Sequence, residues 1–182
     1  YTLITGASAG IGEVFAKQLA LQGSNLILVA RRKEKLDQLA AELSAEYKVK
    51  VETIAADLIE PSASLEIANQ ISTSGWNVNG LINNAGFGDR GPFLELPLER
   101  QLQMIQLNVT ALVDLSYRLL PSIKKQTNPY IINVASTAAF QAGPNMAIYY
   151  ATKAFVLSFS EALHEAALAS RGNAIHIRNR RR

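Results

Sequence analysis

The sequence contains no cysteine and only two histidines, His164 and His176, among its 182 residues. The lack of cysteine excludes disulfides and thiolate metal sites from this stretch of chain. A metal site built on histidine needs several ligands close together, so we expect no metal. No apolar run reaches the roughly 20 residues that a transmembrane helix requires, and no signal peptide is recognised. We therefore expect a cytoplasmic protein that has no membrane partner.

Charged residues are also scarce, at 18% of the chain against 48% hydrophobic residues. This composition is sufficient for one folded core and is not typical of disorder. The net charge is +3, but four of the last five residues are arginine, and without them 14 basic residues face 15 acidic ones. We predict one dinucleotide-binding domain over residues 1–177 and a basic tail over 178–182. A nucleic-acid-binding tail is the remote alternative, because the tail is short and has no interleaved aromatic residues.

Short β-prone runs alternate with helical patterns along the chain. We expect strands at 1–5, 25–30, 49–55, 80–83, 130–134 and 174–177, and helices at 11–23, 34–46, 61–74, 98–123 and 146–170. This alternation predicts an α/β fold of the Rossmann type, which is a doubly wound parallel sheet with helices on both faces. The carboxyl ends of the strands meet at one edge of such a sheet, and ligands bind there.

Three glycines, Gly6, Gly10 and Gly12, lie between the first strand and the first helix. Glycine permits a tight turn and a close approach of the backbone to a ligand or a neighbouring strand. The helix N-terminus that follows has free N–H groups and about half a positive charge, which suits a pyrophosphate. The alternative is an ordinary turn between a strand and a helix.

Arg31 and Arg32 follow the second strand, where sites for NAD usually have an acidic residue. A guanidinium group pairs well with the 2′-phosphate of NADP, whereas an acid would repel it. We predict NADP(H) as the cofactor. The alternative is that both side chains are simply solvated.

Tyr149 and Lys153 lie four residues apart, and Ser136 precedes Tyr149 by thirteen residues. On a helix, Tyr149 and Lys153 share one face. The positive charge of lysine favours the phenolate, which makes the phenol a better proton shuttle near neutral pH. Taken alone, the pair is a weak signal that favours an ordinary exposed helix face, because Tyr-x-x-x-Lys occurs often by chance.

Together these motifs resemble those of the short-chain dehydrogenase/reductase family. The resemblance covers residues 5 to about 170, including the cofactor loop from Thr5 to Gly12, the turn from Asn83 to Gly86, and Asn108 within a long helix. It implies a catalytic set of Asn108, Ser136, Tyr149 and Lys153. It also implies cofactor contacts from Gly6, Ser8, Ala9, Gly10, Ile11, Gly12, Arg31, Arg32, Asp57, Leu58, Asn84, Ala85 and Gly86, together with Tyr149 and Lys153.

The resemblance also implies a mechanism. Tyr149 exchanges a proton with the carbonyl or alcohol oxygen, Lys153 stabilises the phenolate and holds the nicotinamide ribose, and Ser136 hydrogen-bonds the carbonyl oxygen. Asn108 bends its helix and positions a water that relays protons to Lys153. Each residue has a structural alternative: Ser136 ends a strand, Asn108 is a solvated or capping amide, and Asp57 begins a helix. Asn83 is expected mainly to tie strands together.

The resemblance breaks after about residue 170, because no Pro-Gly segment, lid or seventh strand follows. We expect a truncated or altered chain that lacks its last strand or strands. The alternative function is therefore a non-catalytic NADP(H)-binding module with an incomplete substrate pocket. Four apolar residues, Phe87, Phe93, Phe140 and Met146, are candidates for that pocket. A homo-oligomer, dimer or tetramer, is expected to form through the two long helices.

Overall fold

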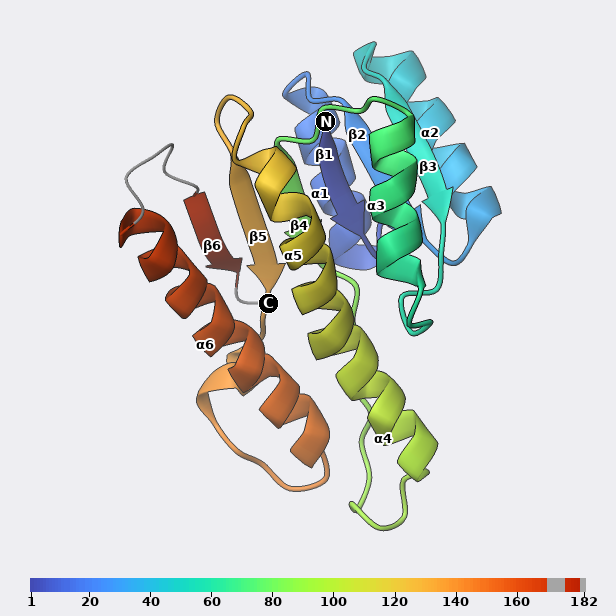
Figure 1. The fold of residues 1–182 in the computed structure, drawn as a ribbon. Coiled ribbons are helices and arrows are strands. Elements are labelled where there is room, and N and C mark those ends of the chain that lie inside the picture. Colours follow the sequence, from blue (N-terminus) through green and yellow to red (C-terminus); the bar gives the residue numbers. More distant parts are fainter. Residues whose placement is uncertain (170–175, 181–182) are drawn as a thin grey trace.

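The fold is that of a computed structural model, which describes residues 1–169 and 176–180, with side chains up to residue 168. One sheet of six parallel strands has the order β3-β2-β1-β4-β5-β6 (Figure 1). Its strands are β1 (Thr2–Thr5), β2 (Leu26–Ala30), β3 (Val51–Ala55), β4 (Gly80–Asn83), β5 (Tyr130–Val134) and β6 (His176–Arg180). The strand order reverses between β1 and β4. This confirms the predicted doubly wound α/β fold.

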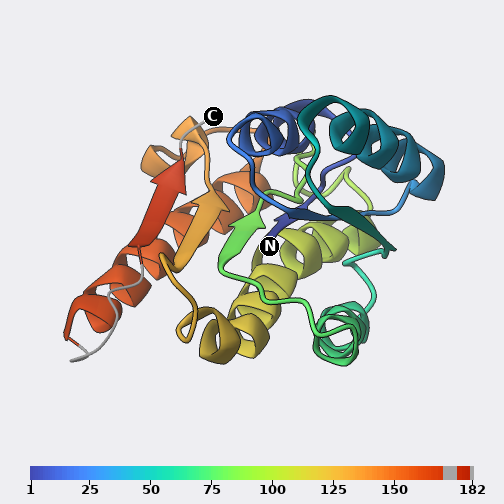
Figure 2. The same cartoon turned by 90° about the horizontal axis from the view of Figure 1, so that it is seen from above.

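Helices cover both faces of the sheet, as Figure 2 shows from above. The helical segments are α1 (Gly10–Leu21), α2 (Lys33–Tyr47), α3 (Ala63–Thr73), α4 (Leu98–Ile105), η1 (Gln106–Thr110), α5 (Ala111–Ile123), η2 (Thr137–Phe140) and α6 (Ala147–Ala169). The buried cores place α1 and α2 on one face, and α3, α5 and α6 on the other.

Alternation along the strands divides the apolar side chains between two cores. In β1, Leu3 packs in the core under α3 and α5, whereas its neighbour Ile4 packs in the core under α1 and α2. The adjacent residues Leu81 and Ile82 of β4 divide in the same way. Successive side chains of a strand point to opposite faces, so a sheet buried on both faces requires unbroken apolar runs. The fully apolar pattern of these strands follows from that geometry.

Two features differ from the sequence prediction by more than one or two residues at the end of an element. The helix expected at 98–123 contains a π-helical turn, η1, between α4 and α5. β6 continues to Arg180, so it includes three residues that the sequence places in a separate tail, because its ladder with β5 extends from Tyr130↔His176 to Val134↔Arg180. The predicted start of this strand and the last two arginines lie outside the described residues. In the described part, no helix is long and apolar enough to cross a membrane.

Candidate active site

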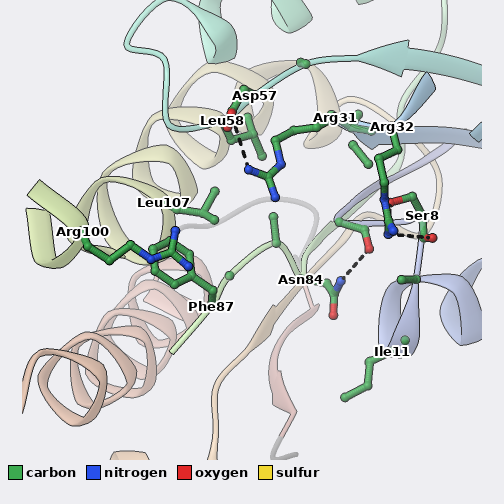
Figure 3. Close-up of a pocket in the computed structure, with 18 residues that line it drawn as sticks. Ser8, Ile11, Arg31, Arg32, Asp57, Leu58, Asn84, Phe87, Arg100 and Leu107 are labelled. Carbon is green, nitrogen blue, oxygen red and sulfur yellow. Dashed lines mark hydrogen bonds and ion pairs between the residues drawn. The ribbon is translucent and has the colours of Figure 1, made fainter. Parts of the chain in front are cut away.

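A cavity of about 470 Å³ lies where the strand order reverses, beyond the carboxyl ends of β1, β2, β3 and β4 (Figure 3). In an open α/β sheet this crevice is where ligands bind. Twelve predicted cofactor residues line it: Gly6, Ser8, Ala9, Gly10, Ile11, Arg31, Arg32, Asp57, Leu58, Asn84, Ala85 and Gly86. Gly12, Tyr149 and Lys153 are not among its lining residues.

The three glycines of the loop have three different roles. Gly6 has φ +66°, and a Cβ there would lie 2.9 Å from Asn84 Nδ2. Gly10 has φ +59°, with nothing within 4 Å of an added Cβ, so its backbone borders open space. A Cβ on Gly12 would collide with the Gly6 carbonyl oxygen and with Asn84 Nδ2. Gly12 therefore allows the start of α1 to pack closely against Gly6 and Asn84, whereas Gly10 leaves room for a ligand.

A buried hydrogen-bond group joins this loop to the turn after β4. Asn84 donates from Nδ2 to the carbonyl oxygens of Thr5, at 2.9 Å, and Gly6, at 3.3 Å. The Thr5 hydroxyl accepts from the backbone N–H groups of Asn84, at 3.0 Å, and Ala85, at 2.9 Å. Asn84 thus shapes the wall of the cavity through the backbone that it holds.

The two arginines at the end of β2 are arranged differently. Arg32 Nη2 donates to the carbonyl oxygen and the hydroxyl of Ser8, at 3.2 and 3.0 Å. Arg31 lies 3.7 Å from Asp57 Oδ2, and its side chain is 70% exposed. An ion pair this long and this exposed contributes little stability, so Arg31 can leave it at small cost. Asp57 also accepts a hydrogen bond from the backbone N–H of Ile59.

Asn108 lies at the centre of the second part of the site. It is 1% exposed within η1, and its amide makes a reciprocal pair with Phe87, donating to the carbonyl oxygen at 2.9 Å and accepting from the N–H at 3.1 Å. Its Nδ2 also donates to Thr152 Oγ1, whose hydroxyl donates to the Tyr149 carbonyl oxygen. π-helical turns are often found at functional sites. Here the turn connects the residue after Gly86 with the first turns of α6.

Lys153 and Tyr149 lie on one face of α6, as their spacing predicts. The Lys153 ammonium is buried, donates to the Val134 carbonyl oxygen at 2.9 Å, and lies 5.9 Å from the centre of the Tyr149 ring. A Cβ added to Gly86 would lie 2.9 Å from Asn108 Oδ1 and 3.6 Å from Lys153 Nζ. The turn after β4 therefore contacts both catalytic candidates at its last glycine.

Ser136 lies two residues after the end of β5 and caps η2, where its Oγ accepts from the Ala138 N–H at 3.2 Å. A hydroxyl that accepts one bond retains its own hydrogen for donation. Capping and donation to a carbonyl oxygen are compatible.

A second cavity, of about 10 Å³, is lined by Tyr149, Met146 and Phe93. It has room for about one water molecule. Two of the four predicted pocket residues thus lie beside Tyr149, whereas Phe87 lines the larger cavity and Phe140 is half-exposed on η2.

Five further residues line the larger cavity without having been predicted: Val29, Ala30, Ala56, Arg100 and Leu107. Most are apolar and occupy strand ends or helix faces, where a core residue looks the same in sequence. Arg100 was missed because α4 has charged residues on its exposed side, and only the packing of α4 shows which of them faces the cavity.

Comparison with known proteins decides the family. The sequence model of the short chain dehydrogenase family matches residues 1–178. The chain belongs to the short-chain dehydrogenase family. The very-long-chain 3-oxoacyl-CoA reductase of Bos taurus is 34% identical over 171 residues, which cover 91% of this chain and 54% of the relative. The chain thus spans about half the length of the curated relatives that it matches.

Solved structures of the same family share its fold. A short-chain dehydrogenase from Sphingobium yanoikuyae in complex with NADPH has a TM-score of 0.91 and 37% identity, over 99% of this chain and 69% of that one. A short-chain dehydrogenase from Burkholderia phymatum in complex with NAD has a TM-score of 0.91 and 26% identity, over 99% of this chain and 64% of that one. Members similar to this chain therefore bind either nicotinamide dinucleotide.

The cavity of this short-chain dehydrogenase fits such a cofactor. The N-cap residue of α1, Ala9, has no capping side chain, so N–H groups of the first turn are available to an anion. Gly10 leaves the open space that a close backbone approach needs. Arg31 and Arg32 add positive charge at the end of β2.

Proposed function

We propose that this chain forms the cofactor-binding and catalytic part of an NADP(H)-dependent oxidoreductase that interconverts a carbonyl compound and an alcohol. The observation that supports this most is the position of Gly86, which borders both the cavity of about 470 Å³ and the group of Asn108 and Lys153. One turn of chain thus links a dinucleotide-sized cavity to proton-transfer residues. The bound cofactor would supply or accept the hydride.

The residues of the site divide the work of proton transfer. Tyr149 is the proton donor in reduction and the acceptor in oxidation, since it is the phenol on the α6 face that bears Lys153. The Lys153 ammonium, held by the Val134 carbonyl oxygen, favours the phenolate. Ser136 donates to the substrate oxygen as charge develops on it. Asn108 fixes the loop at Phe87 and, through Thr152, the start of α6.

A turnover assay distinguishes the proposed oxidoreductase from the alternative, a non-catalytic NADP(H)-binding module. NADPH would be mixed with a panel of ketones, aldehydes and 3-oxoacyl thioesters, and loss of its absorbance at 340 nm followed alongside its fluorescence on binding. We expect turnover that Tyr149→Phe lowers at least 100-fold with the dissociation constant of NADPH changed less than threefold. Tyr150→Phe is the matched control, since Tyr150 precedes Thr152 on the same helix but lines neither cavity. Binding without turnover on every substrate would favour the non-catalytic module.

The preference for NADP(H) over NAD(H) is part of the proposal. It is supported by Arg31 and Arg32 at the cavity wall and by the weak, exposed ion pair of Arg31 with Asp57. Arg31→Asp should weaken NADPH binding about tenfold or more and leave NADH binding unchanged or improved, because a carboxylate repels the 2′-phosphate. An unchanged ratio of the two dissociation constants would contradict the assignment. Lys35→Asp on the exposed side of α2 is a charge-matched control.

We also propose that the protein is a cytoplasmic homo-oligomer. A contact between subunits is supported by exposed apolar side chains on α4, α5 and α6. Among them are Leu98, Tyr117 and Phe155, which stacks on Phe159. Exposed patches of this kind mark association surfaces. Light scattering of the protein and of Tyr117→Lys measures the mass, and cell fractionation measures the location.

A further inference from the structure

Arg100 lies in the first turn of α4 and lines the larger cavity on the side away from Arg32 and Ser8 (Figure 3). It is the third arginine of this cavity. Arg31 and Arg32 come from the end of β2, whereas Arg100 comes from the other side of the switch point, beside Phe87 and Leu107. The charge of Arg100 is therefore placed to bind a different part of a ligand from the part that Arg31 and Arg32 face.

Two contacts hold the Arg100 guanidinium in place. Its Cζ lies 4.0 Å from the centre of the Phe87 ring, and its Nε donates to Asp89 Oδ2 at 3.3 Å. The other oxygen of Asp89 accepts from the backbone N–H of Arg90, which fixes the carboxylate in turn. Stacking and a single Nε bond orient the plane of a guanidinium without using its outer nitrogens.

The outer nitrogens of Arg100 make no hydrogen bond to any described residue, and the side chain is 45% exposed. Four N–H donors therefore remain on a fork that is already oriented. Such a fork binds two oxygens of a phosphate at once, and a pre-oriented one loses little side-chain entropy on binding. Arg32, in contrast, already spends one outer nitrogen on Ser8.

The phosphates of the cofactor already have other partners in the proposed site. The pyrophosphate belongs at the uncapped start of α1, and the 2′-phosphate at Arg31 and Arg32. Arg100 instead stacks on Phe87, whose backbone N–H and carbonyl groups are both bonded to Asn108. A phosphate bound by Arg100 would therefore lie on the side of the cavity that Asn108 borders through Phe87.

We propose that Arg100 is a specificity-determining residue that binds a phosphate carried by the substrate, at a distance from its carbonyl group. The inference rests on the proposed oxidoreductase function. The substrate class that it favours is a carbonyl compound joined to a phosphorylated carrier, of which an acyl thioester of coenzyme A is one form. A bound phosphate would use the outer nitrogens of Arg100, which Asp89 does not occupy. The stack on Phe87 and the bond from Nε to Asp89 would therefore persist.

A pair of thioesters tests the proposal. Acetoacetyl-coenzyme A has the phosphates, and acetoacetyl-N-acetylcysteamine has the same reacting end without them. We expect Arg100→Met to raise KM for the coenzyme A thioester about tenfold with kcat unchanged, because the lost contact is the same in the ground and transition states. KM for the neutral thioester and the dissociation constant of NADPH should stay within twofold. Arg100→Lys should show an intermediate KM, since it keeps charge but loses the fork.

Arg118→Met is the matched control, because Arg118 is a partly exposed arginine paired with Asp114 on α5 and does not line the cavity. It should leave both KM values unchanged. An equal rise in KM for both thioesters, or a rise in the dissociation constant of NADPH, would overturn the proposal and assign Arg100 to the fold or to the cofactor. Unchanged values for Arg100→Met would overturn it as well.

Failure of the proposed function has a separate signature. If no carbonyl compound is turned over, calorimetry with coenzyme A and the NADP⁺-loaded protein still measures the phosphate contact. Binding that Arg100→Met weakens about tenfold and Arg118→Met does not weaken would support the site. Absence of coenzyme A binding to the parent protein would overturn it, whether or not turnover of other substrates is found.

Discussion

Replacement of Thr5 by valine removes one hydroxyl from the junction between the glycine loop and the turn after β4. Thr5 is 1% exposed, and its hydroxyl accepts from the N–H groups of Asn84, at 3.0 Å, and Ala85, at 2.9 Å, and donates to the Ile82 carbonyl oxygen at 3.3 Å. Valine has nearly the same shape and suits a strand. The variant therefore tests the hydrogen bonds with little change in packing.

The loss in the free energy of unfolding of Thr5→Val depends on which backbone N–H groups lose their only acceptor. The Asn84 N–H keeps a second acceptor, the Ile82 carbonyl oxygen at 3.1 Å, so its loss is partial. The Ala85 N–H has no other acceptor among the described residues. One unsatisfied, part-buried donor and one weakened bond give a loss of about 2 to 3 kcal/mol in the free energy of unfolding for Thr5→Val. Thr5→Ser keeps the hydroxyl and loses one buried methyl group, which costs about 1 kcal/mol.

Urea denaturation measures both variants against the parent protein. A lower midpoint with an unchanged m-value reports a loss of stability. Thr73→Val is the control, because the exposed Thr73 hydroxyl at the end of α3 donates only to the carbonyl oxygens of Asn69 and Gln70, and we expect a change within about 0.5 kcal/mol. NADPH binding should weaken in Thr5→Val and be retained in Thr5→Ser, since Ala85 lines the cavity.

The relative stability of Thr5→Val and Thr5→Ser decides whether the Thr5 hydroxyl holds the turn after β4. If Thr5→Val is as stable as Thr5→Ser, or more stable, the hydroxyl does not hold the turn, and the hydrogen-bond reasoning is wrong. If both lose stability but neither loses affinity for NADPH, the junction supports the fold and does not shape the cavity.

Three further predictions follow from other contacts. Gly12→Ala should weaken NADPH binding more than tenfold by fluorescence titration, because its Cβ would collide with the Gly6 carbonyl oxygen and displace the loop; unchanged binding would contradict this role. Asn133→Ala should lower the free energy of unfolding in urea by about 2 to 3 kcal/mol, because buried Asn133 accepts from Asn83 and donates to Ser160; a loss under 1 kcal/mol would contradict it. Burial raises the pKa of Tyr130 in the folded protein, so the stability that this phenol contributes below about pH 10 is lost as pH rises through its folded pKa. Tyr130→Phe should therefore lose less stability than the parent between pH 9 and 11 in urea melts, and equal losses would refute the assignment.

Local sequence determined the order of strands and helices along the chain and predicted most of the residues that line the larger cavity. Unbroken apolar runs predict strands buried on both faces, and right-handed crossovers then bring their carboxyl ends to one edge. Gly6 and Gly10 occupy positive φ angles, a preference that belongs to the residue itself. The spacing of Tyr149 and Lys153 places them on one face of any helix, and α6 is a helix there. These features need no knowledge of distant partners.

Tertiary structure alone decided which polar residues work together. Thr5 meets Ala85 and Arg100 meets Phe87 only after the sheet has formed, and in sequence Thr5 and Arg100 look like an ordinary strand residue and an ordinary surface residue. The atom that Gly12 packs against is also known only from the fold, because the Gly6 carbonyl oxygen approaches Gly12 after the chain has turned back. β6 extends to Arg180 because backbone pairing with β5 is indifferent to side-chain type. Periodicity and residue type determine the helices and strands, whereas the orientation of a side chain such as Arg100 depends on the partners that the packed elements bring to it.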